Sequence, residues 1–101
     1  MPVYEIDISP SAHEDVKGIR DYLTAEAPFY VDRIINAIYD RMEDLSVFPY
    51  SCAKLEDLPD IRRLVVEGYS AFYMVYEDLK LVRIFNVYHH ARDTKDLKFE
   101  V

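Results

Sequence analysis

The residues best suited to chemistry on a phosphate gather in the last third of this 101-residue chain. Arg62 and Arg63 stand side by side, and a long apolar run ends in His89-His90-Ala91-Arg92-Asp93. An arginine is always charged and can hold a phosphate through two parallel hydrogen bonds. A histidine can give or take a proton near neutral pH. Such a set can bind RNA phosphates or act on them without a metal ion.

Adjacent residues of a strand point to opposite faces of its sheet, and this rule divides both pairs. We expect one of His89 and His90 to face a ligand while the other is buried. Likewise, one of Arg62 and Arg63 is expected to be free while its neighbour pairs with an acid. The plain alternative is that all four are structural, because an arginine in a chain with 19 acids pairs on the surface by default.

Three further residues are candidates for contacts with a ligand or a partner. Arg83 lies mid-strand among apolar neighbours, so it faces an open side of the sheet or is paired, because a buried lone charge is very costly. Tyr69 and Tyr88 fall on neighbouring strands, where packing is the commoner role and stacking on a base the rarer one. No metal site is expected, because the chain has one cysteine and no His-x-His or His-x-x-x-His spacing.

The composition describes one globular domain over residues 1–101. Half of the residues are hydrophobic, which is enough for a modest core. The single cysteine, Cys52, excludes an intrachain disulfide. No apolar run approaches the roughly 20 residues of a membrane helix, so we expect a soluble, cytoplasmic protein with no membrane contact.

The charge of the chain limits its partners. A net charge of −7 argues against a protein that coats nucleic acid. The acidity belongs mainly to the first half, however, since residues 51–101 carry nine acids and eight bases. A local basic site in the second half is therefore compatible with the composition.

Hydrophobic periodicity predicts a strand and two helices in the first half. Residues 3–8 alternate as a half-buried strand. The helix that follows has capping-box spacing at Ser11 and Glu14, and its Gly18 would permit close approach of a second helix. The apolar stripe of that second helix runs from Val31 to Leu45. A short connection makes the two helices an antiparallel hairpin.

Three strands complete the predicted fold after a loop over residues 49–60. They cover residues 61–66, 69–76 and 81 to 89 or 90, and the last has apolar residues on both faces, as a central strand does. The short turns Glu67-Gly68 and Glu77-Asp78 join them, so they pair antiparallel. The order β-α-α-β-β-β is that of an α+β domain, with an N-terminal strand and an antiparallel sheet packed against a two-helix hairpin.

These segments together resemble the RelE/ParE superfamily of toxins from bacterial type II toxin–antitoxin systems. The matching sequences are Ser9-Pro10-x-Ala12-x-x-Asp15-Val16-x-x-Ile19-x-x-Tyr22-Leu23, Leu45-x-x-Phe48-Pro49, Arg62-Arg63, Gly68-Tyr69-x-x-Phe72-Tyr73 and Val82-x-Ile84-x-x-Val87-x-His89-x-Ala91-Arg92-Asp93. They span nearly the whole chain. The fold that the resemblance implies agrees with the one predicted from periodicity.

The resemblance implies one of three functions. RelE-like members are ribosome-dependent mRNA endonucleases that use no metal or other cofactor; the RNA 2′-hydroxyl attacks the adjacent phosphate, assisted by a general base, a general acid and cations. ParE-like members inhibit DNA gyrase by binding, and a degenerate member would only bind its antitoxin. We expect the endonuclease first and the gyrase inhibitor next. All three predict a cognate antitoxin as partner, beside ribosome and mRNA, or DNA gyrase, for the first two.

For the endonuclease, the resemblance places a cationic and acid–base set near the strand ends: Arg63 or Arg62 on the phosphate, His90 or His89 as acid or base, and Arg92 as added positive charge. Lys54 corresponds to the basic loop residues of some members. Two departures count against this activity. Ser70 stands where RelE-like members often have arginine, and the chain is acidic where ribosome-targeting members tend to be basic.

Overall fold

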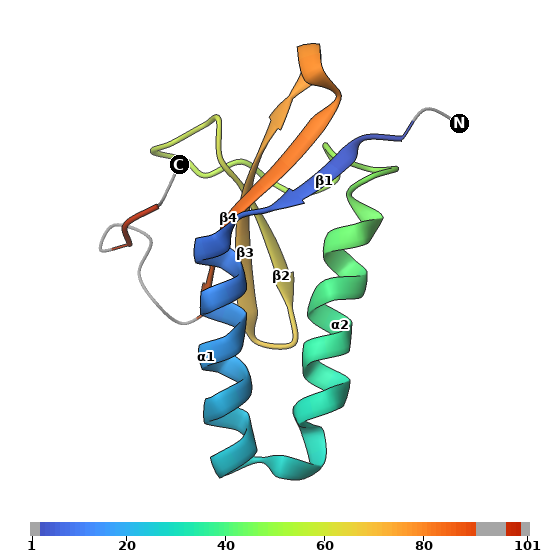
Figure 1. The fold of residues 1–101 in the computed structure, drawn as a ribbon. Coiled ribbons are helices and arrows are strands. Elements are labelled where there is room, and N and C mark those ends of the chain that lie inside the picture. The colour runs from blue at the N-terminus through green and yellow to red at the C-terminus, as the bar shows by residue number, and fades with distance from the viewer. Residues whose placement is uncertain (1–2, 91–96, 100–101) are drawn as a thin grey trace.

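The chain folds in the predicted order of elements (Figure 1). The computed structural model describes residues 3–90 and 97–99. Its helices and strands are β1 (Glu5–Ile8), α1 (Pro10–Glu26), α2 (Val31–Asp44), β2 (Arg62–Val66), β3 (Tyr69–Tyr76) and β4 (Leu81–His89), with short 3₁₀ turns at Pro28–Tyr30 and Glu77–Leu79. In these described ranges, neither helix is long and apolar enough to cross a membrane.

The four strands form one sheet in the order β1-β4-β3-β2. β2, β3 and β4 pair antiparallel, as their short turns predicted. β1 pairs parallel with β4, so that Ile6 lies opposite Val82 and Ile8 opposite Ile84. A parallel pair needs a long connection, and the whole chain from α1 to β3 supplies it. β4 therefore has a neighbour on each side, as the apolar residues on both of its faces predicted.

The two helices form an antiparallel hairpin that covers one face of the sheet (Figure 1). α1 lies against β4 and α2 against β2. Val16, Ile38 and Met42 carry the apolar stripes into the main core. A second, smaller core lies on the opposite face of the sheet, around Phe72 and Phe85. Below, the face that the helices leave uncovered is called the open face.

The N-cap of α1 lies two residues before the predicted one. Ser9 is the N-cap, because its hydroxyl oxygen accepts a hydrogen bond from the Ala12 N–H at 3.1 Å. The same hydroxyl donates to the carbonyl oxygen of Phe85 in β4 at 3.1 Å. Ser9 thus caps the helix and ties its first turn to the sheet. Ser11 lies inside the helix, so the capping box expected with Glu14 was wrong.

A cluster around Glu77 ties the β3–β4 turn to the N-terminal strand and to the chain after α2. Lys80 donates its ammonium to the Glu77 carboxylate, and Tyr50 and Tyr4 donate their hydroxyls. These hydrogen bonds, that of Lys80 first, lower the pKa of Glu77 to about 2. The negative charge of Glu77 is therefore part of what holds the turn in place.

Replacing Glu77 with glutamine will lower the melting temperature at pH 7 but not near pH 2. A carboxyl whose pKa is lower in the folded state than in the unfolded state stabilises the fold at any pH above its ordinary pKa of 4.5. This contribution is lost as the pH falls toward the folded-state pKa of about 2. Thermal unfolding of wild type and Glu77→Gln between pH 7 and pH 2 measures the difference. Glu56→Gln, at an exposed loop position, is the matched control. A difference that does not vary with pH contradicts the assignment.

Candidate functional site

A β-bulge in β4 decides which candidate residues share a face of the sheet. Phe72 of β3 pairs with Asn86, but the next residue, Tyr73, pairs with Ile84. Phe85 is therefore an extra residue on β4. One inserted residue reverses the alternation of all side chains beyond it.

Beyond the bulge, Val87 and His89 face the helices, and Tyr88 and His90 face the open side. Val87 is buried in the main core, and the ring of His89 meets Tyr69 edge-on with 5.6 Å between centroids. Tyr88 packs against the smaller core of the open face. The two histidines thus lie on opposite faces, as the alternation predicted, and the open face receives His90.

Arg63 also lies on the open face. Its guanidinium carbon is 5.2 Å from the ring centroid of Phe72, a cation–π contact. Its Nε is buried and has no hydrogen-bond partner among the residues that the structure describes. A buried N–H donor without an acceptor is costly, so this arginine is suited to an anionic ligand.

His90 is held at the end of β4 by two hydrogen bonds. Its backbone N–H donates to the carbonyl oxygen of Gly68 at 2.8 Å, and its Nδ1 lies 3.1 Å from the hydroxyl oxygen of Ser70. Ser70 is fully buried, whereas His90 is exposed. The hydroxyl therefore fixes the orientation of the imidazole, and Nε2 is the ring nitrogen for which the described residues provide no hydrogen-bond partner.

Arg63 and His90 lie at different positions along the open face of the sheet. Arg63 pairs with Phe72 of β3, whereas His90 bonds to Gly68, four residues earlier in the chain and across β3 from β2. At ~3.3 Å per residue and ~4.8 Å between strands, their backbones are about 16 Å apart. An acid or base acts within about 3 Å of the proton it moves. In this structure Arg63 is stacked on Phe72 and His90 is held by Ser70.

Arg62 and Arg83 are engaged in contacts that stabilise the fold. Arg62 donates to the carbonyl oxygen of Cys52 at 2.7 Å and lies over the ring of Tyr50, 5.0 Å from its centroid. Arg83 pairs with Asp7 across the β1–β4 pair. The ion pair of Arg83 is one of the two alternatives considered on the sequence, whereas Arg62 contacts a carbonyl oxygen and an aromatic ring where pairing with an acid was expected.

The two candidate tyrosines lie on opposite faces of the sheet. Tyr69 is buried on the helix side, and this burial, with a smaller effect of Tyr22, raises the pKa of its hydroxyl. Tyr88 lies on the open face and donates its hydroxyl to the carbonyl oxygen of Lys98 at 2.5 Å. The rings of Tyr88 and Phe99 are 6.4 Å apart, so residues 97–99 cover part of the open face.

The remaining candidates are Lys54 and Arg92. Lys54 is exposed and forms an isolated antiparallel bridge with Arg62 at the start of β2. Arg92 lies outside the described residues. In the part of the chain that is described, no group of three His, Cys, Asp or Glu side chains is placed to hold a metal ion.

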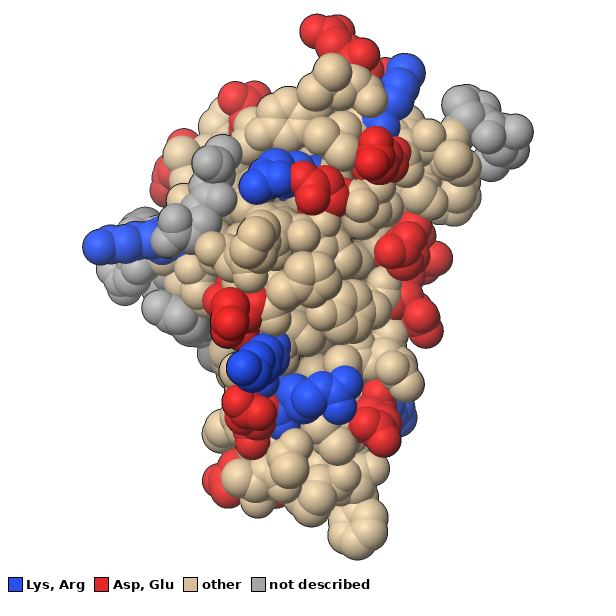
Figure 2. Space-filling view, in the orientation of Figure 1, with Lys and Arg blue, Asp and Glu red and all other residues tan. Residues whose placement is uncertain are grey.

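The charged side chains on one face of the protein do not favour binding along a nucleic-acid backbone. Figure 2 shows Lys and Arg side chains next to Asp and Glu on the face seen in Figure 1, without a continuous positive area among the described residues. Arg20–Asp32 and Arg33–Glu67 are two ion pairs of exposed or partly exposed side chains. A protein that follows a nucleic-acid backbone presents a continuous basic surface, which this face does not do.

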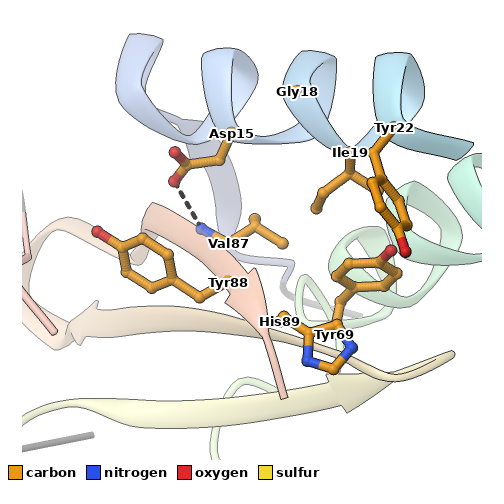
Figure 3. A pocket seen from close by; sticks show the side chains of 8 residues that line it. All are labelled: Asp15, Gly18, Ile19, Tyr22, Tyr69, Val87, Tyr88 and His89. Carbon is orange, nitrogen blue, oxygen red and sulfur yellow. Dashed lines mark hydrogen bonds between the residues drawn. The ribbon is translucent and has the colours of Figure 1, made fainter. Parts of the chain in front are cut away.

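A groove of about 450 Å³ lies between α1 and the C-terminal half of β4 (Figure 3). Its lining residues come from α1, β3 and β4: Asp15, Gly18, Ile19, Tyr22, Tyr69, Val87, Tyr88 and His89. Gly18 and Ile19 lie on the α1 side and Val87 lies across from them. Asp15 is at one end, and Tyr22, Tyr69 and His89 are at the other.

This groove was not predicted from the sequence. The four α1 positions 15, 18, 19 and 22 share one helix face, and a glycine among them was a signal. Gly18 was expected to permit close approach of a second helix, but no described residue lies within 4 Å of the position that its Cβ would occupy. The described helices do not make such an approach at Gly18. A glycine inside a helix costs up to about 1 kcal/mol relative to alanine, and packing within the described chain does not require it.

Asp15 joins α1 to the bulge. Its Oδ2 accepts hydrogen bonds from the Val87 N–H at 2.9 Å and from the Asn86 side-chain amide at 3.0 Å. Its other oxygen, Oδ1, receives no hydrogen bond from the residues described here. Asp15 therefore has a structural role through one oxygen and offers the other at the end of the groove.

Solved structures with the same fold are toxins and toxin–antitoxin complexes. A chromosomal ParDE system from P. aeruginosa matches with a TM-score of 0.74 and 18% identity, over 88% of this chain and 98% of that one. The RelBE2 complex of Mycobacterium tuberculosis matches with a TM-score of 0.68 and 22% identity, over 91% of this chain and 97% of that one. A mutant of the E. coli toxin RelE in the free state matches with a TM-score of 0.65 and 14% identity, over 88% of this chain and 85% of that one.

The sequence of the chain matches one family model over most of its length. No curated protein matches the chain significantly. The family model for the ParE toxin of the type II toxin–antitoxin system parDE matches residues 6–94, which is nearly the whole chain. The β-α-α-β-β-β fold and the matched segments agree with it, and the chain belongs to the ParE toxin family of type II toxin–antitoxin systems, within the RelE/ParE superfamily.

Proposed function

We propose that this toxin acts by binding its target and not by cleaving RNA, and that the target is DNA gyrase. The observation that carries the proposal is the separation of Arg63 from His90 on the open face, by about 16 Å at the backbone. Cleavage needs an acid, a base and phosphate-binding cations around one bond. The match to the ParE model supports the same choice, because the resemblance to ParE-like members implies gyrase inhibition.

Two variants separate binding from catalysis in this proposal. Arg63→Ala and His90→Ala each remove one residue of the expected catalytic set. Single residues outside an interface hot spot contribute less than ~1 kcal/mol, so both variants are expected to inhibit gyrase within about fivefold of wild type. A catalytic acid, base or phosphate ligand would instead change the rate by 10²-fold or more.

The test expresses the toxin without its antitoxin and measures two activities. Purified wild type and both variants are assayed for inhibition of gyrase supercoiling on relaxed plasmid, and mRNA 5′ ends are mapped in the induced cells. Circular dichroism confirms that each variant is folded. Inhibited supercoiling with intact mRNA supports the proposal. Normal supercoiling with codon-phased mRNA cleavage that His90→Ala abolishes overturns it.

The mRNA endonuclease expected first from the sequence stays a prediction, and one observation favours it. The Ser70 hydroxyl orients His90 through Nδ1 at 3.1 Å, as an acid–base histidine requires. The variant Ser70→Ala is a further test that distinguishes the mRNA endonuclease from the gyrase inhibitor. It is expected to lower an mRNA cleavage rate that depends on His90, whereas a toxin that binds gyrase elsewhere is expected to tolerate it.

A further inference from the structure

The tip of the two-helix hairpin carries an exposed apolar segment. α1 ends at Glu26 and α2 begins at Val31, and the turn between them contains Pro28, Phe29 and Tyr30. Phe29 is 96% exposed and Tyr30 is 54% exposed. In Figure 1 the turn lies at the opposite end of the molecule from the β3–β4 turn, and in Figure 2 that end is mostly uncharged.

Packing within the described chain gives no reason for a phenylalanine at this turn. A phenylalanine side chain gains about 1.5–3 kcal/mol when it is buried, and Phe29 gains almost none of this. A single exposed apolar residue is common on protein surfaces. Here three such residues, Pro28, Phe29 and Tyr30, follow one another and all are exposed. A contiguous apolar patch of this kind marks an interaction surface.

The turn holds the two aromatic rings in a defined position. The ring of Pro28 fixes its backbone angle φ. The Ala27 N–H donates to the carbonyl oxygen of Leu23 at 2.7 Å, and the Tyr30 N–H donates to that of Ala27 at 2.9 Å. The guanidinium carbon of Arg33 lies 5.5 Å from the centroid of the Tyr30 ring. A segment that is ordered before binding loses little conformational entropy when it binds.

The charge that the hairpin tip offers to a partner is negative. Both arginines near the tip are engaged, Arg20 with Asp32 and Arg33 with Glu67. Glu26, the last residue of α1, is exposed and forms no ion pair with another described residue. The tip therefore presents an apolar surface beside a carboxylate, and it is complementary to an apolar pocket with a basic border.

The size and the charge of the tip determine what kind of partner fits it. Even with both aromatic rings of both copies fully buried, a tip-to-tip dimer would bury at most about 1,000 Å², below the roughly 1,200 Å² at which specific interfaces begin. A concave partner surrounds the same rings and also contacts the flanks of both helices. The net charge of −7 favours a partner with a basic surface, and an enzyme that binds DNA has such a surface.

We infer that the hairpin tip is the surface through which this toxin binds DNA gyrase, with Phe29 in an apolar pocket bordered by lysine or arginine. Tyr30 packs at the rim of that pocket, and Glu26 pairs with its basic border. The inference rests on the proposal that the target is gyrase, and it adds which part of the toxin makes the contact.

The test measures binding and inhibition of purified gyrase holoenzyme by variants of the full-length toxin. Phe29→Ala is expected to raise both the Kd and the concentration for half-inhibition of supercoiling by about 30-fold or more, as the loss of a hot spot does. Phe48→Ala is the matched control, because Phe48 is 64% exposed and follows the other end of α2. It is expected to stay within about threefold of wild type. Glu26→Gln is expected to slow association about threefold at low salt, with no difference at high salt.

Melting temperatures of the free variants show that the fold is intact, and Phe29→Ala is expected to melt within about 4 °C of wild type. If wild type inhibits gyrase and Phe29→Ala binds equally well, the inference is overturned while gyrase stays the target. Equal losses for Phe29→Ala and Phe48→Ala also overturn it. A wild-type toxin that neither binds nor inhibits gyrase overturns both proposals.

A photoreactive p-benzoylphenylalanine in place of Phe29 or of Phe48 gives a direct readout of the contact. Crosslinking to gyrase from position 29 and not from position 48 supports the inference, and it identifies the pocket by the peptide that is crosslinked. Crosslinking from position 48 alone, or from neither position at a toxin concentration that inhibits supercoiling, contradicts it.

Discussion

Replacing Asp15 with alanine will lower the free energy of unfolding by about 3 kcal/mol, because two donors at the bulge lose a charged acceptor. The Val87 N–H and the Asn86 amide both donate to its Oδ2, at 2.9 and 3.0 Å. A hydrogen bond to a charged group contributes about 1.5–3 kcal/mol. In a domain of this size the loss corresponds to a fall in melting temperature of roughly 12–24 °C.

Urea and thermal unfolding of two further variants make this prediction specific. Asp15→Asn retains a side-chain oxygen near the same position and is expected to recover most of the loss. Glu14→Ala changes the neighbouring exposed acid, with an expected effect within about 0.5 kcal/mol. A loss for Asp15→Ala that is no larger than that for Glu14→Ala contradicts the role assigned to the carboxylate.

The fold followed from periodicity because each stripe is long. The apolar residues from Val31 to Leu45 specify one helix face, and the alternation over residues 3–8 specifies a strand. Alternation does not specify the neighbour of that strand, however. β1 pairs with β4, where Asp7 meets Arg83, 76 residues further along the chain, and no local pattern encodes such a distant partner.

The candidate site was harder to predict because one residue decides it. Leu81 to His89 is apolar on both faces, so nothing in the pattern marks Phe85 as the extra residue. Uninterrupted alternation from Ile84 would have placed His90 with the helices and His89 on the open face. The bulge reverses both. Alternation alone therefore separates the histidines correctly but cannot say which one a ligand meets.

For Arg62 and Arg63, too, alternation separates the two side chains without saying which of them is bound. Alternation predicts that Arg62 and Arg63 point to opposite faces. Which of them is bound depends on the loop before β2, which folds back so that the Cys52 carbonyl oxygen meets Arg62 and the Ala53 carbonyl oxygen accepts from the Arg63 backbone N–H. Loop conformation of this kind depends on tertiary contacts and has no periodic signal.

Truncating Phe85 to alanine is expected to lower the free energy of unfolding by about 3–5 kcal/mol. The ring is fully buried in the smaller core with Ile61 and Phe72. The sheet lies on one side of it and residues 97–99 on the other, so few elements can move in to fill the cavity. Phe85→Leu keeps most of the volume and should cost less than ~1.5 kcal/mol. A loss below ~1 kcal/mol for Phe85→Ala contradicts a closed core on the open face.

The same variant tests what holds residues 97–99 on the sheet. The Phe99 ring lies 5.6 Å from Phe85 and 4.8 Å from Phe72. A double-mutant cycle of Phe85→Ala with Phe99→Ala is expected to give a coupling of about 0.5–1.5 kcal/mol. Coupling near zero makes Phe72 the anchor, and Phe72 also carries the Arg63 guanidinium. In that case a partner that displaces Phe99 would change the packing of Phe72, the ring on which Arg63 is stacked. Strong coupling instead means that residues 97–99 are held by Phe85, the extra residue of the bulge that places His90 on the open face.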